Sequence, residues 1–300
     1  MGRRGDEEIR LSRNDLEDNE KESAEVSSPP PVPASLLPPL SASPRPRVSV
    51  SPLPPLSASP RHRVAPSRVL LWDIDGTLIR SARAGAFKDY TIPMLEQVFG
   101  TSGRLAEMQV SGMTDLQIVA EALRDEGFTH DDVRSRIDQL RERYMEEMKR
   151  ATGNGEEFFE LLPGVRETLA AIASQPRYRS ALLTGNIEAA AYLKMELMRL
   201  TEFFDLPGAF GDESHDRSDL PELAAERIKQ HLGIDLEPQQ FIVIGDTPND
   251  IACAKHFGAR SLAVGTGRLY STKDLLDCNP DAFVPNLADP GQVLKVLQEL

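Results

Sequence analysis

The chain has 300 residues, of which 40% are hydrophobic and 27% are charged, and its formal net charge is −13 at pH 7. This negative charge disfavours nucleic acid and anionic membranes as the main partners. No stretch of about 18 apolar residues is present that could span a membrane. Two cysteines are too few for a disulfide framework and fit a reduced, cytoplasmic compartment.

Residues 1–67 differ in composition from the rest of the chain and predict a disordered, proline-rich tail. The first 68 residues hold 13 of the 23 prolines and no Phe, Trp or Tyr, so they cannot bury enough apolar surface to offset the entropy of ordering. The segment 38–48 returns almost unchanged at 54–64, as in an extended polyproline-type tail. Such a tail serves most simply as a tether, and a protein-docking segment is the alternative.

Short apolar runs without alternation follow the tail, as expected for parallel strands that are covered on both faces. The predicted strands are Val69–Ile74, Arg179–Thr184, Phe241–Asp246, Ser261–Val264 and Ala282–Val284, with a weaker one near Phe203–Leu206. Helical patterns separate them: one opens at Pro163, one is capped by Asn186, and two cover Ser218–Leu232 and Pro248–Phe257. This alternation predicts the α/β class, with a doubly wound, mostly parallel sheet.

A long helical segment separates the first strand from the second. Residues 81–162 show only helical patterns, over Ala84–Phe99, Thr114–Glu126 and Asp131–Lys149. We therefore expect a core formed by residues 68–80 and 163–300, with residues 81–162 inserted into it as a smaller helical unit.

Two carboxylates follow the first predicted strand directly. The run Val69–Trp72 continues as Asp73-Ile74-Asp75-Gly76-Thr77, which places both acids at the carboxyl edge of the sheet, where open α/β folds bind ligands. A single acid there could be a solvated strand end. Two acids separated by one residue and followed by a glycine turn indicate a site that holds a metal and attacks an electrophile.

Two later strand ends add polar groups to the same edge. Thr184-Gly185-Asn186 offers a hydroxyl and free backbone amides at a helix N-terminus, which form an anion site, although Thr and Asn are also ordinary N-caps. Asp246 and Asp250 follow another apolar strand and converge on the edge that carries Asp73. Asp250 could alternatively complement the dipole of its helix.

These motifs resemble those of the haloacid dehalogenase (HAD) superfamily, whose first motif is DxDGT. Within that superfamily the chain is most similar to the phosphoglycolate-phosphatase-like branch, through Asp75-Gly76-Thr77-Leu78, Gly112-Met113-Thr114-Asp115, Leu183-Thr184-Gly185-Asn186 and Gly245-Asp246-Thr247-Pro248. The resemblance covers the whole body and none of the tail. It implies a HAD-like Rossmannoid core with an α-helical cap, residues 81–162, inserted after the first strand.

The resemblance also implies a role for each acid. Asp73 is the expected nucleophile and forms an aspartyl-phosphate, and Asp75 protonates the leaving alkoxide and then activates water. The implied cofactor is Mg²⁺, bound by Asp73, Asp246 and the backbone carbonyl of Asp75, with Asp250 supporting that shell.

The remaining implied residues bind the substrate. Thr184, the amides of Gly185 and Asn186, and Arg217 are expected to hold the phosphoryl oxygens. The cap turn, with Gly112, Thr114 and Asp115, is expected to face the leaving group. Arg217 is a departure, since it stands where the family usually has a lysine, and Lys194 could share its role.

The implied activity is hydrolysis of a small phosphomonoester, with phosphoglycolate as the leading substrate by resemblance alone. Dehalogenases and phosphonoacetaldehyde hydrolases lack the acid at the position of Asp75, and the second reaction also needs a cap lysine, for which Lys88 and Lys149 have no supporting context. A sugar phosphomutase shares all four motifs and stays an alternative. A catalytically retired HAD-fold binding protein is less favoured, because all four acids are present.

Overall fold

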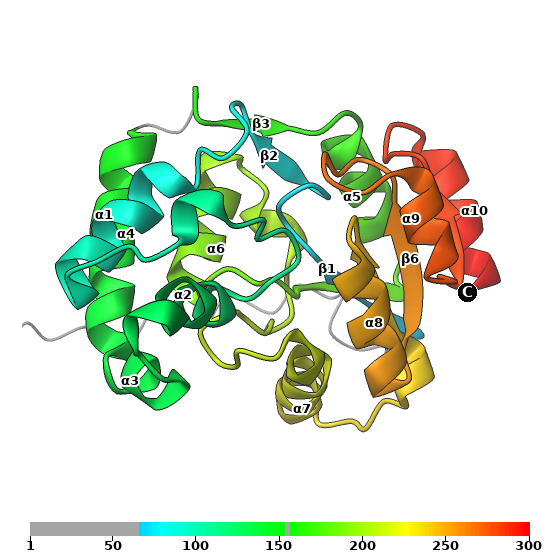
Figure 1. Cartoon of the computed structure of the whole chain (residues 1–300). Helices are drawn as coiled ribbons and strands as arrows, with labels where there is room; N and C mark the ends of the chain where they lie inside the picture. The colour runs from blue at the N-terminus through cyan, green and yellow to red at the C-terminus, as the bar shows by residue number, and fades with distance from the viewer. Residues whose placement is uncertain (1–65, 154–156) are drawn as a thin grey trace, which may run out of the picture. The chain divides into compact units, whose positions relative to one another are not determined.

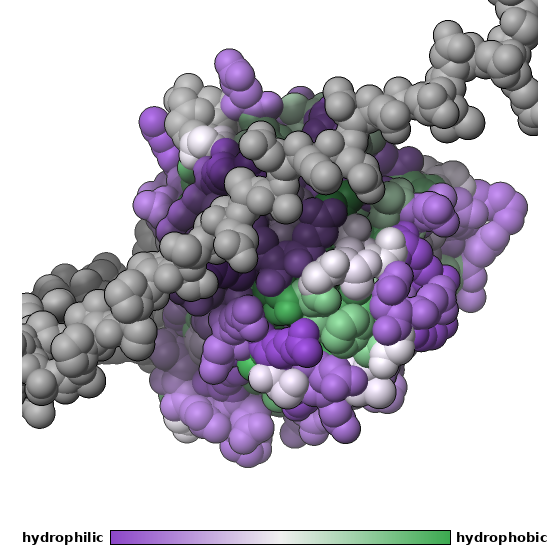
Figure 2. Space-filling view, turned by 60° about the vertical axis from the view of Figure 1, so that its left-hand side comes forward, coloured by the Kyte–Doolittle hydropathy of each residue, from purple (hydrophilic) through white to green (hydrophobic). Residues whose placement is uncertain are grey.

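The computed structural model describes residues 66–153 and 157–300 (Figure 1). The predicted tail, residues 1–67, lies outside the described residues except for its last two, and so does its possible docking role. Among the described residues, no helix is long and apolar enough to cross a membrane. Hydrophilic residues predominate on the face shown in Figure 2, in line with the high charged fraction of the chain.

A five-stranded parallel sheet forms the centre of the described chain, with the strand order β4-β1-β5-β6-β7. The strands are β1 (Arg68–Trp72), β4 (Tyr178–Leu182), β5 (Phe241–Gly245), β6 (Arg260–Val264) and β7 (Ala282–Val284). Each was predicted from its apolar run to within a few residues. The sheet confirms the predicted α/β class.

Helices cover both faces of this sheet. They are α5 (Val165–Ala173), α6 (Glu188–Leu197), α7 (Leu220–Leu232), α8 (Pro248–Phe257), α9 (Thr272–Asp277) and α10 (Pro290–Glu299). Along β1, Leu70 and Trp72 belong to a core cluster with residues of α5, α6 and α10, whereas Val69 and Leu71 belong to a second cluster with residues of α7 and α8. Successive strand residues point to opposite faces, so both faces of β1 are buried, which explains its continuous apolar run.

The helical insert lies between two short antiparallel strands, β2 (Ile79–Ser81) and β3 (Phe159–Leu161). Its helices are α1 (Lys88–Phe99), α2 (Asp115–Leu123), α3 (His130–Ser135) and α4 (Ile137–Thr152), and α1 packs against α4 (Figure 1). The two strands escaped the sequence prediction because three residues are too few to show a period.

Three predicted elements differ from the structure. The helix expected over Ala84–Phe99 begins only at Lys88, and the one expected over Asp131–Lys149 is divided at Arg136, which ends α3 and precedes α4. The weak strand expected near Phe203–Leu206 is wrong. A 3₁₀ turn ends at Phe203, and the chain then follows the edge of β4 with one isolated bridge, between Leu183 and Ala209.

The remaining regular elements are short 3₁₀ turns. They lie at Leu105–Glu107, Arg124–Glu126, Thr201–Phe203, Arg217–Asp219 and Pro238–Gln240. The turn at Arg217–Asp219 leads directly into α7 and contacts α8, and this places Arg217 beside the carboxyl edge of the sheet.

Candidate active site

Three carboxylates meet at the carboxyl edge of the sheet. Asp73 follows β1, Asp246 follows the neighbouring strand β5, and Asp250 lies in the first turn of α8. All three are buried, and one oxygen atom from each lies within 4.8 Å of the others. Their convergence follows from the parallel pairing of β1 with β5, which brings both strand ends to the same place.

One guanidinium neutralises part of this acidic group. Arg217 donates from Nη2 to Oδ1 of Asp73 at 2.8 Å and to Oδ1 of Asp250 at 2.5 Å. Burial raises the pKa of Asp73 to about 7, although Arg217 opposes the shift, and burial raises the pKa of Asp246 well above its ordinary value. When all three carboxylates are ionised, they and the guanidinium carry a net charge of −2, which a hard divalent cation with oxygen ligands would balance. The donor set therefore fits Mg²⁺.

Two glycines leave the space that the carboxylate of Asp246 occupies. A Cβ atom on Gly76 would lie 2.4 Å from Oδ2 of Asp246, and one on Gly267 would lie 2.1 Å from the same atom. Any larger residue at either position would displace the carboxylate. The hydroxyl of Thr77 donates to the other oxygen, Oδ1, at 3.1 Å and so fixes the plane of the carboxyl group.

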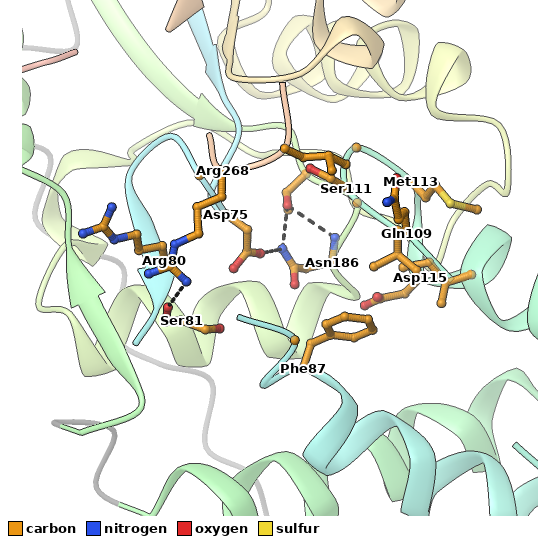
Figure 3. A pocket seen from close by; sticks show the side chains of 18 of the residues that line it. Asp75, Arg80, Ser81, Phe87, Gln109, Ser111, Met113, Asp115, Asn186 and Arg268 are labelled. Atoms are coloured by element: carbon orange, nitrogen blue, oxygen red, sulfur yellow. Dashed lines mark hydrogen bonds between the residues drawn. The ribbon is translucent and has the colours of Figure 1, made fainter. Parts of the chain in front are cut away.

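The side chain of Asp75 lies apart from the acidic group. Its Oδ2 atom accepts from Nζ of Lys194 at 2.6 Å. The same oxygen accepts from Nδ2 of Asn186 at 2.7 Å (Figure 3). The group of potential metal ligands contains the carboxylates of Asp73, Asp246 and Asp250 and does not include that of Asp75. The expected metal contact of Asp75 was through its backbone carbonyl, so the carboxylate stays available for proton transfer.

Lys194 lies on α6 and is almost fully buried. Burial alone would lower the pKa of this amine, but the charge and hydrogen bond of Asp75, together with Tyr90 and Asp115, outweigh burial and raise the pKa of Lys194 above its ordinary value. A second contact, from Nζ to Oδ1 of Asn186 at 2.6 Å, completes its environment. Arg217 and Lys194 therefore occupy different places, one beside Asp73 and the other beside Asp75.

The strand end after β4 holds a buried hydroxyl. Thr184 is fully buried and accepts from Nδ2 of Asn186 at 2.7 Å. The prediction that Asn186 caps α6 is wrong, because the N-cap is Ile187 and it makes no side-chain cap bond. Two carboxylates accept from the first amides of α6 instead. Asp115 accepts from the amide of Ile187 at 2.9 Å. Asp212 accepts from the amide of Glu188 at 3.1 Å.

The turn before α2 contacts the acidic site directly. The carbonyl of Gly112 accepts from Nδ2 of Asn249 at 2.8 Å and from Nη1 of Arg217 at 3.3 Å. Thr114 was expected to face the leaving group, but it is fully buried and its hydroxyl caps α2 by accepting from the amide of Gln117. Asp115, in the first turn of α2, caps α6 and also lines the cavity.

A cavity of about 470 Å³ opens beside these groups. Its wall includes all but two of the predicted site residues, and the two outside it are Thr114 and Asp250. It also contains two buried tyrosines, Tyr90 and Tyr144, and four basic residues that the sequence analysis did not assign to the site: Arg80, Arg83, Lys88 and Arg268. The size suits a small molecule. Of these basic residues, only Arg80 could have been assigned to the site from the sequence, because it follows Asp75 by five positions.

Comparison with solved structures finds the same fold in phosphatases and in a mutase. A predicted phosphoglycolate phosphatase from Haemophilus somnus is 20% identical, with a TM-score of 0.53 over 78% of this chain and 98% of that one. A predicted phosphatase from Clostridium acetobutylicum is 17% identical, with a TM-score of 0.54 over 79% and 100%. The β-phosphoglucomutase of Clostridium difficile is 15% identical, with a TM-score of 0.56 over 78% and 98%.

At these low identities, the structural likeness shows the fold alone. A comparison with curated proteins found no match. A family profile extends the evidence to the sequence: the profile of the haloacid dehalogenase-like hydrolases matches residues 70–264, more than half of the chain. The match covers the strand ends that carry Asp73, Thr184 and Asp246 and thereby confirms the resemblance. The chain belongs to the haloacid dehalogenase-like hydrolase family.

Proposed function

We propose that this hydrolase is a Mg²⁺-dependent phosphatase that cleaves a small phosphomonoester through an aspartyl-phosphate on Asp73. The observation that carries the proposal is the different environment of the two acids of the first motif. Asp73 lies inside the acidic group and is held by Arg217. Asp75 lies outside it and is held by Lys194 and Asn186. Nucleophile and proton donor thus lie two positions apart in the sequence and are held by different cations.

In the first step, an oxygen of Asp73 attacks phosphorus and the bond from phosphorus to the ester oxygen breaks. Arg217 and Thr184 both belong to the cavity wall, and in this proposal the guanidinium and the hydroxyl hold the phosphoryl oxygens as charge develops on them. Asp73, Asp246, Asp250 and the backbone carbonyl of Asp75 would hold Mg²⁺. When bound, this ion supplies positive charge that screens the repulsion between the carboxylate and the phosphate.

Asp75 acts as the general acid in the first step and as the general base in the second. As a carboxylic acid it donates a proton to the leaving alkoxide, and as a carboxylate it then takes a proton from the water that cleaves the aspartyl-phosphate. Lys194 and Asn186 fix its position, because both donate to the same oxygen, Oδ2. The second oxygen is thereby left to exchange the proton with the substrate.

Phosphoglycolate is our leading substrate, and the small cavity and the resemblance to the phosphoglycolate-phosphatase-like branch support it. A sugar phosphomutase is the second candidate. One of the structures with this fold is a β-phosphoglucomutase, and both reactions use the same first step. Release of inorganic phosphate supports the phosphatase, and an isomerised sugar phosphate supports the mutase.

The test is a screen of small phosphomonoesters for release of inorganic phosphate, with and without Mg²⁺. We expect turnover to vanish with EDTA and to return with Mg²⁺, and Asp73→Asn to abolish it. Asp138→Asn is the matched control, because its side chain is 94% exposed and lies outside the cavity wall. Undiminished turnover after exhaustive chelation would reject the metal-dependent mechanism. A wild-type protein that is inactive towards every ester would support the retired binding protein.

A further inference from the structure

Four basic side chains of the cavity wall take no part in the acidic site: Arg80, Arg83, Lys88 and Arg268. Two of them have local partners of their own, since Arg83 pairs with Asp89 and Lys88 donates to the carbonyl of Ala106. The other two, Arg80 and Arg268, share a single acid, Glu160. A chain with a net charge of −13 thus concentrates positive charge in the wall of its cavity.

The shared acid is Glu160 on β3. Arg80 donates from Nε to Oε1 of Glu160, and Nη2 of Arg268 lies 3.6 Å from the same oxygen. Arg268 also donates from Nη1 to the carbonyl of Ser81 at 3.1 Å. One carboxylate pairs with two guanidiniums, so one of the two positive charges is not neutralised. The two side chains are 38% and 44% exposed, so they can accept a further ligand.

Both guanidiniums are tied through the backbone to the acidic site. Gly267, next to Arg268, packs so close to Asp246 that a Cβ atom on it would lie 2.1 Å from Oδ2 of that carboxylate. The neighbouring residue, Thr266, donates its hydroxyl to the carbonyl of Gly76 at 2.6 Å. Arg80 follows Asp75 by five residues and lies on β2. In Figure 3, both arginines stand beside Asp75, on the side of the cavity opposite Asp115.

We propose that Arg80 and Arg268 form a subsite for a second anionic group of the substrate, a carboxylate or a phosphate on its leaving part. The planar fork of a guanidinium matches both groups, and two neighbouring forks can bind one anion from two sides. The proposal rests on the proposed function, which places the phosphoryl group at Asp73. The substrates are then small phosphomonoesters with a second negative charge beyond the ester oxygen.

The test compares the binding of two phosphonates that cannot be hydrolysed, in the presence of Mg²⁺, by calorimetry. In 3-phosphonopropionate a carboxylate occupies the place of the methyl group of propylphosphonate. We expect the wild-type protein to bind the carboxylate compound roughly 10-fold to 100-fold more tightly, as for hydrogen bonds between charged groups. Arg268→Gln and Arg80→Gln should each remove most of this preference and leave the affinity for propylphosphonate unchanged.

Two further variants sharpen the result. Arg260→Gln is the matched control, because Arg260 is 46% exposed, pairs with one acid, Asp281, and lies at the start of β6, outside the cavity wall. It should keep the full preference. Glu160→Gln should increase the preference, because it frees both guanidiniums from their shared acid. Propane-1,3-diylbisphosphonate then identifies the anion: tighter binding than 3-phosphonopropionate indicates a phosphate subsite, and weaker binding indicates a carboxylate subsite.

Equal affinities for the two monophosphonates, or no measurable binding of either, would overturn the subsite. So would arginine variants that weaken both compounds by the same factor. The binding test and the hydrolysis test can fail independently of each other. A protein that prefers 3-phosphonopropionate but releases phosphate from no ester keeps the subsite and loses the phosphatase function. A protein that hydrolyses esters without this preference keeps the function and loses the subsite.

Discussion

The amine of Lys194 lies 2.6 Å from Oδ2 of Asp75, although 119 residues separate the two in the sequence. The pair joins α6 to the first motif, and its members differ in exposure, with 3% for the lysine side chain and 42% for the aspartate. Asp75 can therefore reach the cavity while a buried cation holds it in place. This pairing gives Lys194 a positioning role that does not require contact with the phosphoryl group.

Replacing Lys194 by methionine keeps the length of the side chain and removes the cation. We expect the turnover of alkyl phosphates to fall by about 10-fold to 100-fold, because Asp75 loses the donor that orients it. The loss should be smaller for p-nitrophenyl phosphate, whose leaving group hardly needs a proton. Lys229→Met is the control, since this amine is 55% exposed and pairs with Asp235. Equal losses for both substrates would contradict the positioning role.

Substitutions of the two acids of the first motif should block different steps of the reaction. Asp73→Asn removes the nucleophile, so no phosphoenzyme can form and turnover should fall by about 10⁴-fold or more. Asp75→Asn keeps the nucleophile but impairs cleavage of the intermediate by water. Acid quenching after brief exposure to a labelled aryl phosphate should trap a phosphoenzyme in the second variant and none in the first. Phosphoenzyme formed by Asp73→Asn would show that another residue is the nucleophile.

Two donors from the core hold the carbonyl of Gly112 in the turn before α2. Asn249→Ala removes the 2.8 Å bond, and Arg217→Lys keeps a positive charge but removes the Nη1 atom that donates to Gly112 at 3.3 Å. We expect Asn249→Ala to raise KM several-fold with a smaller change in kcat, because we propose that this turn faces the leaving group. Since both variants act on one carbonyl, their combined effect should be non-additive. Additive losses in kcat/KM would show that the two contacts work independently.

The stability of the fold should depend on pH through Asp115. Burial raises the pKa of this carboxyl from 3.8 to about 6, against the backbone amide of Ile187 and the charge of Lys194, which lower it. The folded state therefore holds the proton more tightly than the unfolded state. The contribution of Asp115 to the free energy of unfolding falls as pH rises from about 4 to about 6, by up to about 3 kcal/mol.

Urea denaturation of the wild-type protein and of Asp115→Asn between pH 4 and pH 7 measures this contribution. The variant has no carboxyl group to titrate at this position, so the difference in free energy of unfolding should shift in its favour as pH rises. Asp138→Asn changes an exposed acid and serves as the control. Parallel curves for the wild-type protein and for Asp115→Asn would show that burial does not raise the pKa of Asp115 in the folded protein.

The strands of the central sheet could be predicted from the sequence because of how they are buried. Residues 69–72 of β1 are all inaccessible to solvent, and a strand covered on both faces must be apolar at every position. The same argument does not apply to β2 and β3, which have three residues each and pair with one another outside the central sheet. The break at Arg136 between α3 and α4 was also missed, since the helical pattern continues across it.

The sequence by itself determined which acids share one edge of the sheet. Parallel strands end at the same edge, so the carboxylates that follow β1 and β5 lie on it wherever the helices pack. Their direct contact depends on the pairing of β1 with β5, which the tertiary structure supplied. Only the tertiary structure decided which cation serves which acid. Arg217 is 144 residues from Asp73, and Lys194 is 119 residues from Asp75. Contacts over such separations depend on how helices pack against the sheet, and no local pattern encodes that packing.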